Sequence, residues 1–346
     1  MKTIVFAGGG TAGHVMPNIA LIDRLKPDYG CVYIGGDGME KDICAARNIP
    51  FYRIDTVKFR RDNLLSNIGV PFKLHACVKQ AKHVLEQIRP ALVFSKGGYA
   101  ALPVVLATKA PVLCHESDYS AGLATKLSKR KATKILCAFE PCAKTFKKGL
   151  FVGTPLNRNL YRGARDLSHY GLSGSKPIIA VVGGSSGAAA VNAAVIEALP
   201  RLLQKYEVIH MTGKNKAGAV AQKGYAAVEF ESDMARLYAT ADIIITRAGA
   251  NALAECIALK KPTIAIPLEK ASRGDQVQNA EYYSGLGAIK VLRESELKTF
   301  VAAVDEVYEG KYKYVNAMSC INVDGTDKIV GIIKEVIDNS EFGIRN

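Results

Sequence analysis

The chain has 346 residues, which is enough for two domains of ordinary size, and 49% of them are apolar, so that two hydrophobic cores can be filled. Its formal net charge of +14 indicates an acidic partner, such as a phosphate-bearing substrate or an anionic lipid surface. The sequence has no signal peptide, no apolar run near the roughly 20 residues that span a bilayer and no motif of the common nucleic-acid-binding folds, so we expect a protein that stays in the cytoplasm.

The first half of the chain alternates short apolar segments with segments of helical length. A buried strand is predicted at residues 3–7, and it is followed at once by glycines and then by a helix over 15–25. Further strands are predicted at residues 31–34, 92–94, 112–114 and 135–137. Helix-length segments such as 72–88 lie between most of these strands, and this alternation is typical of a parallel, doubly wound sheet.

The same plan begins again after Pro155. A strand is predicted at residues 177–182, glycines follow at once, and a helix begins at Ala188. Further strands are predicted at residues 207–211, 242–246 and 263–266.

We therefore divide the chain into two α/β domains. The N-terminal domain comprises residues 1–155 and the C-terminal domain residues 156–325, with the boundary in a stretch of polar and turn residues. Residues 326–346 include a helical pattern that can pack back onto the first domain.

Each predicted sheet has a glycine-rich loop at the end of its first strand. Glycine lets the backbone approach a ligand closely, and the N-terminus of the following helix offers unpaired N–H groups and about half a positive charge. Residues 8–14 (GGGTAGH) therefore predict a loop that binds either a phosphate or a reacting sugar. Residues 183–187 (GGSSG) predict a second anion-binding loop, with a tight strand-to-helix turn as the alternative. Since ligands of such sheets bind beyond the carboxyl ends of the strands, we expect a nucleotide diphosphate in a cleft between the domains.

Two side chains near these loops are candidates for chemistry. A helix N-terminus disfavours the imidazolium form of His14, so its neutral imidazole is suited to accept a hydroxyl proton as a general base. Glu255 lies in an otherwise apolar helical segment, where its carboxylate can accept two hydrogen bonds from a ribose diol. The loop 272–279 is dense in amides and charge, as expected of a sugar-binding loop. The alternative for His14 is a surface or helix-capping histidine, and the alternative for Glu255 is a solvated helix face.

Five segments carry a resemblance to a known family. They are GGGTAGHVMPNIAL (8–21), FSKGGYAALPVVLA (94–107), CHESDYSAGLATKLS (114–128), GGSSGAAAVNAA (183–194) and RAGANALAECIALKKPTIAIPLEKASRGDQVQNA (247–280). In this order they resemble the MurG family of glycosyltransferases over nearly the whole chain. The resemblance implies a GT-B fold, in which two doubly wound domains enclose an interdomain cleft. It also implies inverting transfer of N-acetylglucosamine from UDP-N-acetylglucosamine to the 4-hydroxyl of lipid I, the undecaprenyl-pyrophosphoryl N-acetylmuramoyl pentapeptide, which forms lipid II in peptidoglycan synthesis.

The resemblance further implies roles for residues at matching positions, with His14 as the catalytic base or its assistant. The acceptor-binding residues it implies are Gly10, Thr11, Gly13, His14, Gly97, Gly98, Tyr99, His115 and Glu116. The donor-binding residues it implies are Thr11, Ala12, Gly13, Asp118, Arg158, Ser185, Ser186, Glu231, Ala250, Asn251, Ala252, Glu255, Gln276 and Asn279.

Within the donor set, the resemblance assigns each part of the nucleotide sugar. The uracil is expected near residues 230–231, the ribose at Glu255 and the diphosphate near Ser185. The donor sugar is expected at the amides of Gln276 and Asn279.

The sequence departs from the family pattern at several positions. Asp118 stands where the family's HExN motif commonly has Asn, and Ala12 replaces a usual glycine. At the domain junction the family's arginine position is Asn157, with Arg158 one position later. These departures leave open a MurG-like transferase that uses another glycolipid or another donor.

Two basic segments in the first half predict a membrane-facing surface. Residues 56–89 and 126–134 are rich in Lys and Arg, and apolar side chains lie among the cations of the first segment. Such a surface suits an anionic bilayer, at about 1 kcal/mol for each basic residue near it. We expect a peripheral protein at the cytoplasmic face of the cell membrane, with a solvated helix face as the alternative.

No metal or other cofactor is expected, since the sequence has neither an Asp-x-Asp motif nor cysteines at zinc-ligand spacing. The expected partners are UDP-N-acetylglucosamine, lipid I and the anionic inner-membrane surface, and not nucleic acid. A non-catalytic nucleotide-binding protein is an alternative from another class. A nicotinamide-dependent oxidoreductase is a third, because residues 8–13 contain a G-x-G-x-x-G spacing, although Asp37 is a poor match for its acidic partner.

Overall fold

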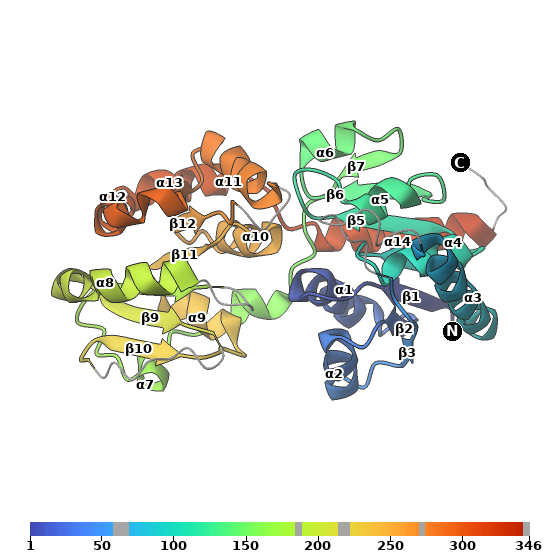
Figure 1. The fold of residues 1–346 in the computed structure, drawn as a ribbon, viewed down its shortest axis with the longest axis horizontal. Coiled ribbons are helices and arrows are strands. Elements are labelled where there is room, and N and C mark those ends of the chain that lie inside the picture. The colour runs from blue at the N-terminus through green and yellow to red at the C-terminus, as the bar shows by residue number, and fades with distance from the viewer. Residues whose placement is uncertain (58–68, 184–188, 214–221, 270–273, 342–346) are drawn as a thin grey trace. The chain divides into compact units, whose positions relative to one another are not determined.

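A computed structural model describes residues 1–57, 69–183, 189–213, 222–269 and 274–341 of the protein (Figure 1). The chain forms two compact units. Unit 1 comprises residues 1–157 and 324–346, and unit 2 comprises residues 158–323.

Within the described residues, unit 1 is built on a parallel sheet with the strand order β3-β2-β1-β4-β5-β6-β7. The strands are β1 (Thr3–Ala7), β2 (Gly30–Gly35), β3 (Phe51–Arg53), β4 (Leu92–Ser95), β5 (Val112–Glu116), β6 (Lys134–Cys137) and β7 (Gly149–Phe151). The order runs outward from β1 in one direction and from β4 in the other, which is the doubly wound arrangement that the sequence predicts. The point where the order reverses, between β1 and β4, is where such sheets bind ligands.

The helices of unit 1 follow their strands and cover the sheet. They are α1 (Ala12–Leu25), α2 (Met39–Ala46), α3 (Val70–Ile88), α4 (Ala101–Ala107), α5 (Leu123–Ser128), α6 (Glu140–Lys144) and the C-terminal α14 (Thr326–Glu341). Helix α14 belongs to unit 1 although 166 residues of unit 2 precede it, and it packs beside α1.

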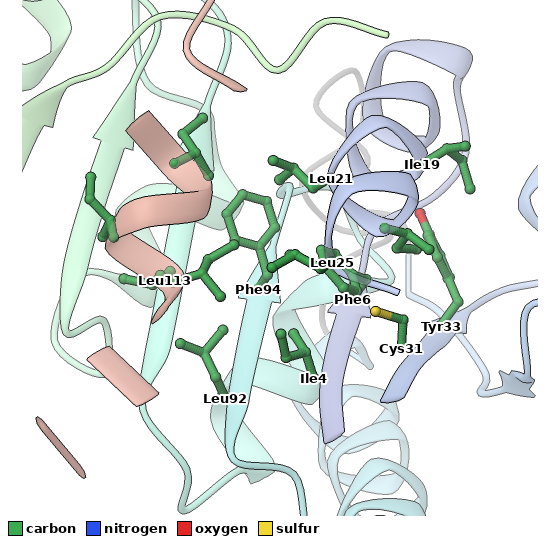
Figure 2. Packing of buried hydrophobic residues seen from close by; sticks show 14 of the residues in the cluster. Ile4, Phe6, Ile19, Leu21, Leu25, Cys31, Tyr33, Leu92, Phe94 and Leu113 are labelled. Atoms are coloured by element: carbon green, nitrogen blue, oxygen red, sulfur yellow. The ribbon is translucent and has the colours of Figure 1, made fainter. Parts of the chain in front are cut away.

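The hydrophobic core of unit 1 explains why the C-terminal helix α14 packs on unit 1. Ile4 and Phe6 of β1 point to the same face of the sheet because side chains alternate along a strand. Ile329, Ile333 and Ile337 repeat every four residues, so they form one apolar stripe on α14, and all three are fully buried in the same cluster. Figure 2 shows part of this cluster, in which Phe6 of β1 and Phe94 of β4 lie next to each other on the sheet.

Unit 2 repeats the architecture on a second parallel sheet, with the order β10-β9-β8-β11-β12-β13 among the residues described there. Its strands are β8 (Ile178–Val182), β9 (Glu207–Met211), β10 (Tyr225–Val228), β11 (Ile243–Arg247), β12 (Thr263–Ile266) and β13 (Lys290–Val291). Its helices are α7 (Leu167–Tyr170), α8 (Ala189–Lys205), α9 (Met234–Thr240), α10 (Ala250–Ala258), α11 (Asp275–Gly285), α12 (Phe300–Glu309) and α13 (Lys311–Ser319), with 3-10 helices η2 (Arg158–Arg162) and η3 (Glu294–Thr299). Ile179 and Val181 of β8 point into one core and Ile178 and Ala180 into the other, so both faces of this sheet are covered.

The prediction of two parallel, doubly wound sheets is confirmed. The short strands β3, β7, β10 and β13 are not predicted from the sequence, because two to four residues near a sheet edge do not form a recognisable apolar run. In the part of the chain that the structure describes, no helix combines the length and the hydropathy needed to cross a membrane.

Candidate functional site

The first glycine loop carries Thr11 and His14 at the carboxyl end of β1. Gly10 has a φ of 87°, a conformation that favours glycine, and it turns the chain into α1. Thr11 is the N-cap of α1 but makes no side-chain cap bond. Its hydroxyl instead lies 3.0 Å from Nδ1 of His14, so the threonine orients the half-buried imidazole of the candidate base.

The loop after β4 comes directly against this histidine. Gly97 and Gly98 have φ values of 80° and 81°, which only glycine adopts readily. A Cβ atom at Gly98 would lie 3.3 Å from the carbonyl oxygen of Gly9 and 3.6 Å from Nδ1 of His14. The loops after β1 and β4 therefore meet at the switch point, and the predicted acceptor residues of these two loops lie together, with Tyr99 exposed beside them.

His115 and Glu116, which end β5, are turned into the protein. The ring of His115 donates from Nε2 to the carbonyl oxygen of Gly153 at 2.9 Å, so its proton is on Nε2. Burial, with the nearby ammonium of Lys96, holds the pKa of His115 well below its usual range, and the ring is neutral.

The carboxylate of Glu116 organises the loop that follows it. It accepts hydrogen bonds from the Gly122 N–H at 2.8 Å and from the Thr125 hydroxyl at 2.6 Å. It also accepts from the N–H of the half-buried Asp118 at 3.4 Å. Glu116 therefore holds the loop of residues 117–125 in place through these hydrogen bonds. Contact of His115 and Glu116 with an acceptor stays a prediction.

A carboxylate of the protein occupies one amide of the first loop. The Gly10 N–H donates to Oε2 of Glu40 at 3.2 Å. Glu40 is 1% exposed and was not singled out from the sequence, because nothing near position 40 marks a carboxylate that turns inward. The loop amide is occupied by a negative charge of the protein itself, so Gly10 cannot offer this N–H to a phosphate in this conformation.

In unit 2, Glu255 lies on α10, which begins directly after β11. It is half-buried, and its Oε2 accepts a hydrogen bond from the Tyr238 hydroxyl at 2.8 Å. Burial raises the pKa of Glu255 to about 7, even though the bond from Tyr238 favours the ionised form. Residues 250–252 form the first turn of the same helix, where backbone N–H groups are not used within the helix.

Helix α11 carries the predicted sugar-binding amides. Oε1 of Gln276 accepts from the Leu268 N–H at 2.9 Å, and Nδ2 of the fully buried Asn279 donates to the carbonyl oxygen of Ala248 at 3.3 Å. These bonds tie α11 to the chain after β12 and after β11. Arg247 is not among the predicted site residues. It forms an ion pair with Glu294 at 2.6 Å, which joins the end of β11 to η3.

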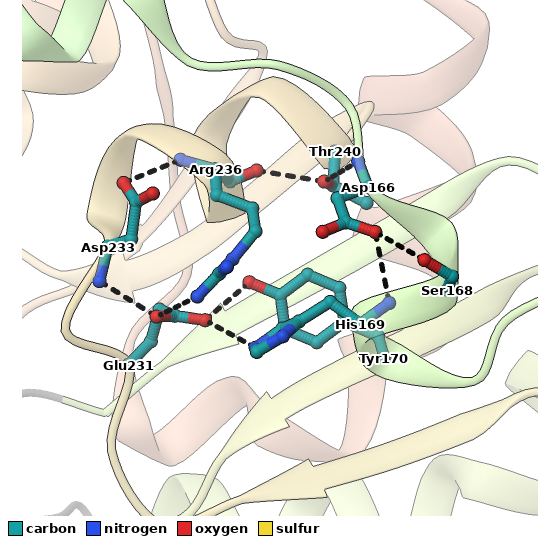
Figure 3. A network of polar contacts seen from close by, with 8 residues as sticks. All are labelled: Asp166, Ser168, His169, Tyr170, Glu231, Asp233, Arg236 and Thr240. Atoms are coloured by element: carbon teal, nitrogen blue, oxygen red, sulfur yellow. Dashed lines mark hydrogen bonds and ion pairs between the residues drawn. The ribbon is translucent and has the colours of Figure 1, made fainter.

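Glu231 lies in a polar network of unit 2 (Figure 3). Its carboxylate accepts from Tyr170 at 2.7 Å, from the Asp233 N–H at 2.8 Å and from Arg236 at 3.0 Å, and it lies 3.3 Å from Nε2 of His169. Burial opposes ionisation, but these donors outweigh it and lower the pKa of Glu231. The carboxylate is thus engaged within unit 2, and its contact with a donor stays a prediction.

Two predicted donor residues, Ser185 and Ser186, lie outside the described residues, as does most of the second glycine loop. Arg158 is exposed at the start of η2. Among the described side chains, no group of three or more His, Cys, Asp or Glu is arranged to hold a metal ion.

Comparison with known proteins identifies relatives over the whole length. Residues 4–137 match the glycosyltransferase family 28 N-terminal domain, and residues 178–332 match the glycosyltransferase family 28 C-terminal domain. The chain is 43% identical to a UDP-N-acetylglucosamine–N-acetylmuramyl-(pentapeptide) pyrophosphoryl-undecaprenol N-acetylglucosamine transferase of Lachnospira eligens, over 99% of this chain and 100% of that one. It is 42% identical to the protein of the same name from Legionella pneumophila strain Paris, over 96% of each chain.

A solved structure is similar as well. The crystal structure of Acinetobacter baumannii MurG superposes with a TM-score of 0.72 at 26% identity and covers 97% of this chain and 100% of that one. Together with the two parallel sheets, this similarity confirms the predicted GT-B fold class.

Proposed function

Because the chain belongs to glycosyltransferase family 28, and within it to the MurG family, we propose that it transfers N-acetylglucosamine from UDP-N-acetylglucosamine to lipid I. The chain is a hexosyltransferase with the GT-B fold. The observation that carries the proposal is 43% identity to a transferase of this name over essentially the whole of both chains.

In the proposed reaction, the 4-hydroxyl oxygen of the muramoyl sugar attacks the anomeric carbon of the donor. A new C–O bond forms with inversion, the bond from that carbon to the diphosphate breaks, and UDP leaves with the bonding electrons. The hydroxyl proton passes to His14. The support for this role is the position of His14 at the switch point of unit 1, where Thr11 orients its ring and Gly98 lies against it.

We propose that unit 2 binds the donor. The ribose diol donates to Glu255, the donor sugar is held at Gln276, and the uracil lies near residues 230–231, where Phe230 is 73% exposed. The leaving diphosphate binds at the second glycine loop and the N-terminus of α8, where the helix dipole stabilises the charge that develops. Each of these contacts is a proposal that mutagenesis can test one residue at a time.

We also propose that unit 1 attaches to an anionic membrane surface as a peripheral protein. Phe72, at the start of α3, is 82% exposed, and Leu127 on α5 is 51% exposed. Lys73 and Lys79 on α3 and Lys126 on α5 are exposed near them in the chain, and α4 packs against both helices. Exposed apolar side chains ringed by cations favour insertion at a lipid interface.

The deciding experiment is transfer of labelled N-acetylglucosamine to purified lipid I, with UDP release measured in parallel. The proposal predicts one UDP released for each sugar transferred. Parallel assays with UDP-glucose, UDP-galactose and other glycolipid acceptors test the alternative of a related transferase with another substrate. Binding of UDP with no transfer to any acceptor would instead favour a non-catalytic nucleotide-binding protein.

A further inference from the structure

Glu40 is a buried carboxylate that the proposed reaction does not use. It lies in the first turn of α2 and is 1% exposed. Its Oε2 accepts from the Gly10 N–H at 3.2 Å, and its Oε1 accepts from the Gly36 N–H at 3.1 Å. One side chain therefore joins the loop after β1 to the loop after β2. Hydrogen bonds from N–H groups to a carboxylate are of the stronger, charge-assisted class.

The surrounding glycines leave room for this carboxylate. A Cβ atom at Gly9 would lie 2.3 Å from Oε1 of Glu40, and one at Gly38 would lie 2.4 Å from Oε2. A Cβ atom at Gly35 would lie 2.9 Å from Cγ of Glu40. Real Cβ contacts are not this short, so a side chain at any of these positions would displace the carboxylate. Glycines in both loops thus serve the packing of Glu40, and not only the approach of a ligand.

The hydrogen bond between Gly10 and Glu40 lies close in the chain to the candidate base, His14. Gly10 precedes Thr11, whose hydroxyl lies 3.0 Å from Nδ1 of His14, and the same ring lies against Gly98. A small displacement of the loop therefore moves His14 relative to the loop after β4. Misplacement of a reacting group by about 1 Å can lower turnover by about 10²-fold.

The negative charge also limits what the loop can bind. A phosphate that approached Gly10 would find its N–H occupied and a carboxylate behind it, and that carboxylate offsets part of the positive end of α1. A neutral hydroxyl-bearing group meets no such repulsion. At Gly10 the loop therefore favours a neutral hydroxyl-bearing group over a phosphate.

We propose that Glu40 is a positioning residue for transfer, which holds the first loop so that Thr11 and His14 face the sugar of the acceptor. This inference rests on the proposed function. Glu40 does not touch the substrate in this proposal, and its carboxylate acts through the hydrogen bond from the Gly10 N–H.

The test compares the variant E40Q with the wild-type protein in the transfer assay. The side-chain amide keeps one oxygen acceptor but turns an NH2 group toward a backbone N–H, so one of the two loop bonds is lost. We expect kcat to fall about 10- to 100-fold. We expect the KM for UDP-N-acetylglucosamine to change much less than kcat, because the proposed contacts to the uracil, the ribose and the diphosphate belong to unit 2.

Two further variants separate positioning from loss of stability. G38A keeps the charge but places a methyl group against Oε2, and Gly38 has a φ of −104°, which alanine accepts. It should lower kcat as E40Q does. The matched control is E207Q, because Glu207 is also buried and accepts from the Gly174 N–H at 2.7 Å, but at the amino end of a strand in unit 2. E207Q should lower the unfolding temperature and leave kcat unchanged.

A double-mutant cycle with H14A decides whether Glu40 acts through His14. In the H14A background, E40Q should lower the remaining rate less than about threefold, because the group that it positions is gone. Wild-type kcat in E40Q, or an equal loss in both backgrounds, would overturn the proposal. Amide exchange of the segment 8–14 should become faster in E40Q and not in E207Q. This readout needs no activity, so failure of the proposed function and failure of the positioning role give different results.

Discussion

The affinity for the donor should depend on pH through Glu255. Burial raises the pKa of this carboxyl to about 7, so the carboxyl is fully ionised only well above neutral pH. The ionised form is the one proposed to accept hydrogen bonds from the ribose hydroxyls. About 90% of the carboxyl is ionised one pH unit above the pKa and about 10% one unit below it. If only the ionised form binds the diol, affinity for UDP-N-acetylglucosamine falls about tenfold between pH 8 and pH 6.

The sign follows from linkage. The free protein holds a proton on Glu255 more tightly than an exposed carboxyl does, and a ligand that prefers the ionised form lowers this pKa and releases the proton. Binding therefore strengthens as pH rises through about 7 and levels off above it. Proton release should be largest below the pKa and vanish well above it.

Titration calorimetry in buffers of different ionisation enthalpy measures both quantities. UDP-N-acetylglucosamine is the suitable ligand, because the terminal phosphate of UDP itself titrates near neutral pH. The variant E255Q should bind more weakly and without this pH dependence. The control E207Q should keep the dependence, since hydrogen bonds outweigh burial and lower the pKa of Glu207, which places its titration below the range. A flat wild-type profile, or the same slope in E255Q, would refute the reasoning.

Three other predictions concern the base, the core and the membrane surface. H14A should lower kcat by about 10²–10⁴-fold with donor affinity unchanged in calorimetry, and near-normal turnover would exclude His14 as the base. I333A should lower the free energy of unfolding of unit 1 by about 2–5 kcal/mol in denaturant titrations, because Ile333 is fully buried between α14 and the sheet, and a loss below about 1 kcal/mol would contradict this packing. F72D should weaken binding to anionic vesicles about tenfold in sedimentation assays. The control Y312D changes an aromatic side chain of unit 2 that is 73% exposed, and it should leave this binding unchanged. Equal effects of the two variants would argue against a specific surface.

The apolar patterns of the sequence predict most of the fold. Buried strands such as β9 and β12 coincide with their predicted residues, because a parallel strand covered on both faces is a continuous apolar run between polar or glycine-rich turns. Helices α3 and α14 begin within two residues of their predicted starts. The family motifs likewise place His14 and Glu255 next to strand ends, which are local features of the chain.

Local patterns do not predict which polar groups of distant segments meet. Glu40 and Gly10 are 30 residues apart, and His115 and Gly153 are 38 apart, yet each pair shares a hydrogen bond. Burial of a polar group is favourable only when a partner lies at the right distance and direction, and this depends on how the loops of neighbouring strands are packed.

The amino-acid sequence by itself therefore determined the two parallel sheets, the family and the segments from which a site is built, because periodicity and motif spacing are properties of neighbouring residues. Only the tertiary structure decided that the first glycine loop is held by the protein's own carboxylate, that Glu231 is engaged in an internal network, and that the pKa of Glu255 is near 7. These properties arise from burial and from contacts between segments far apart in the chain, which exist only once the chain has folded.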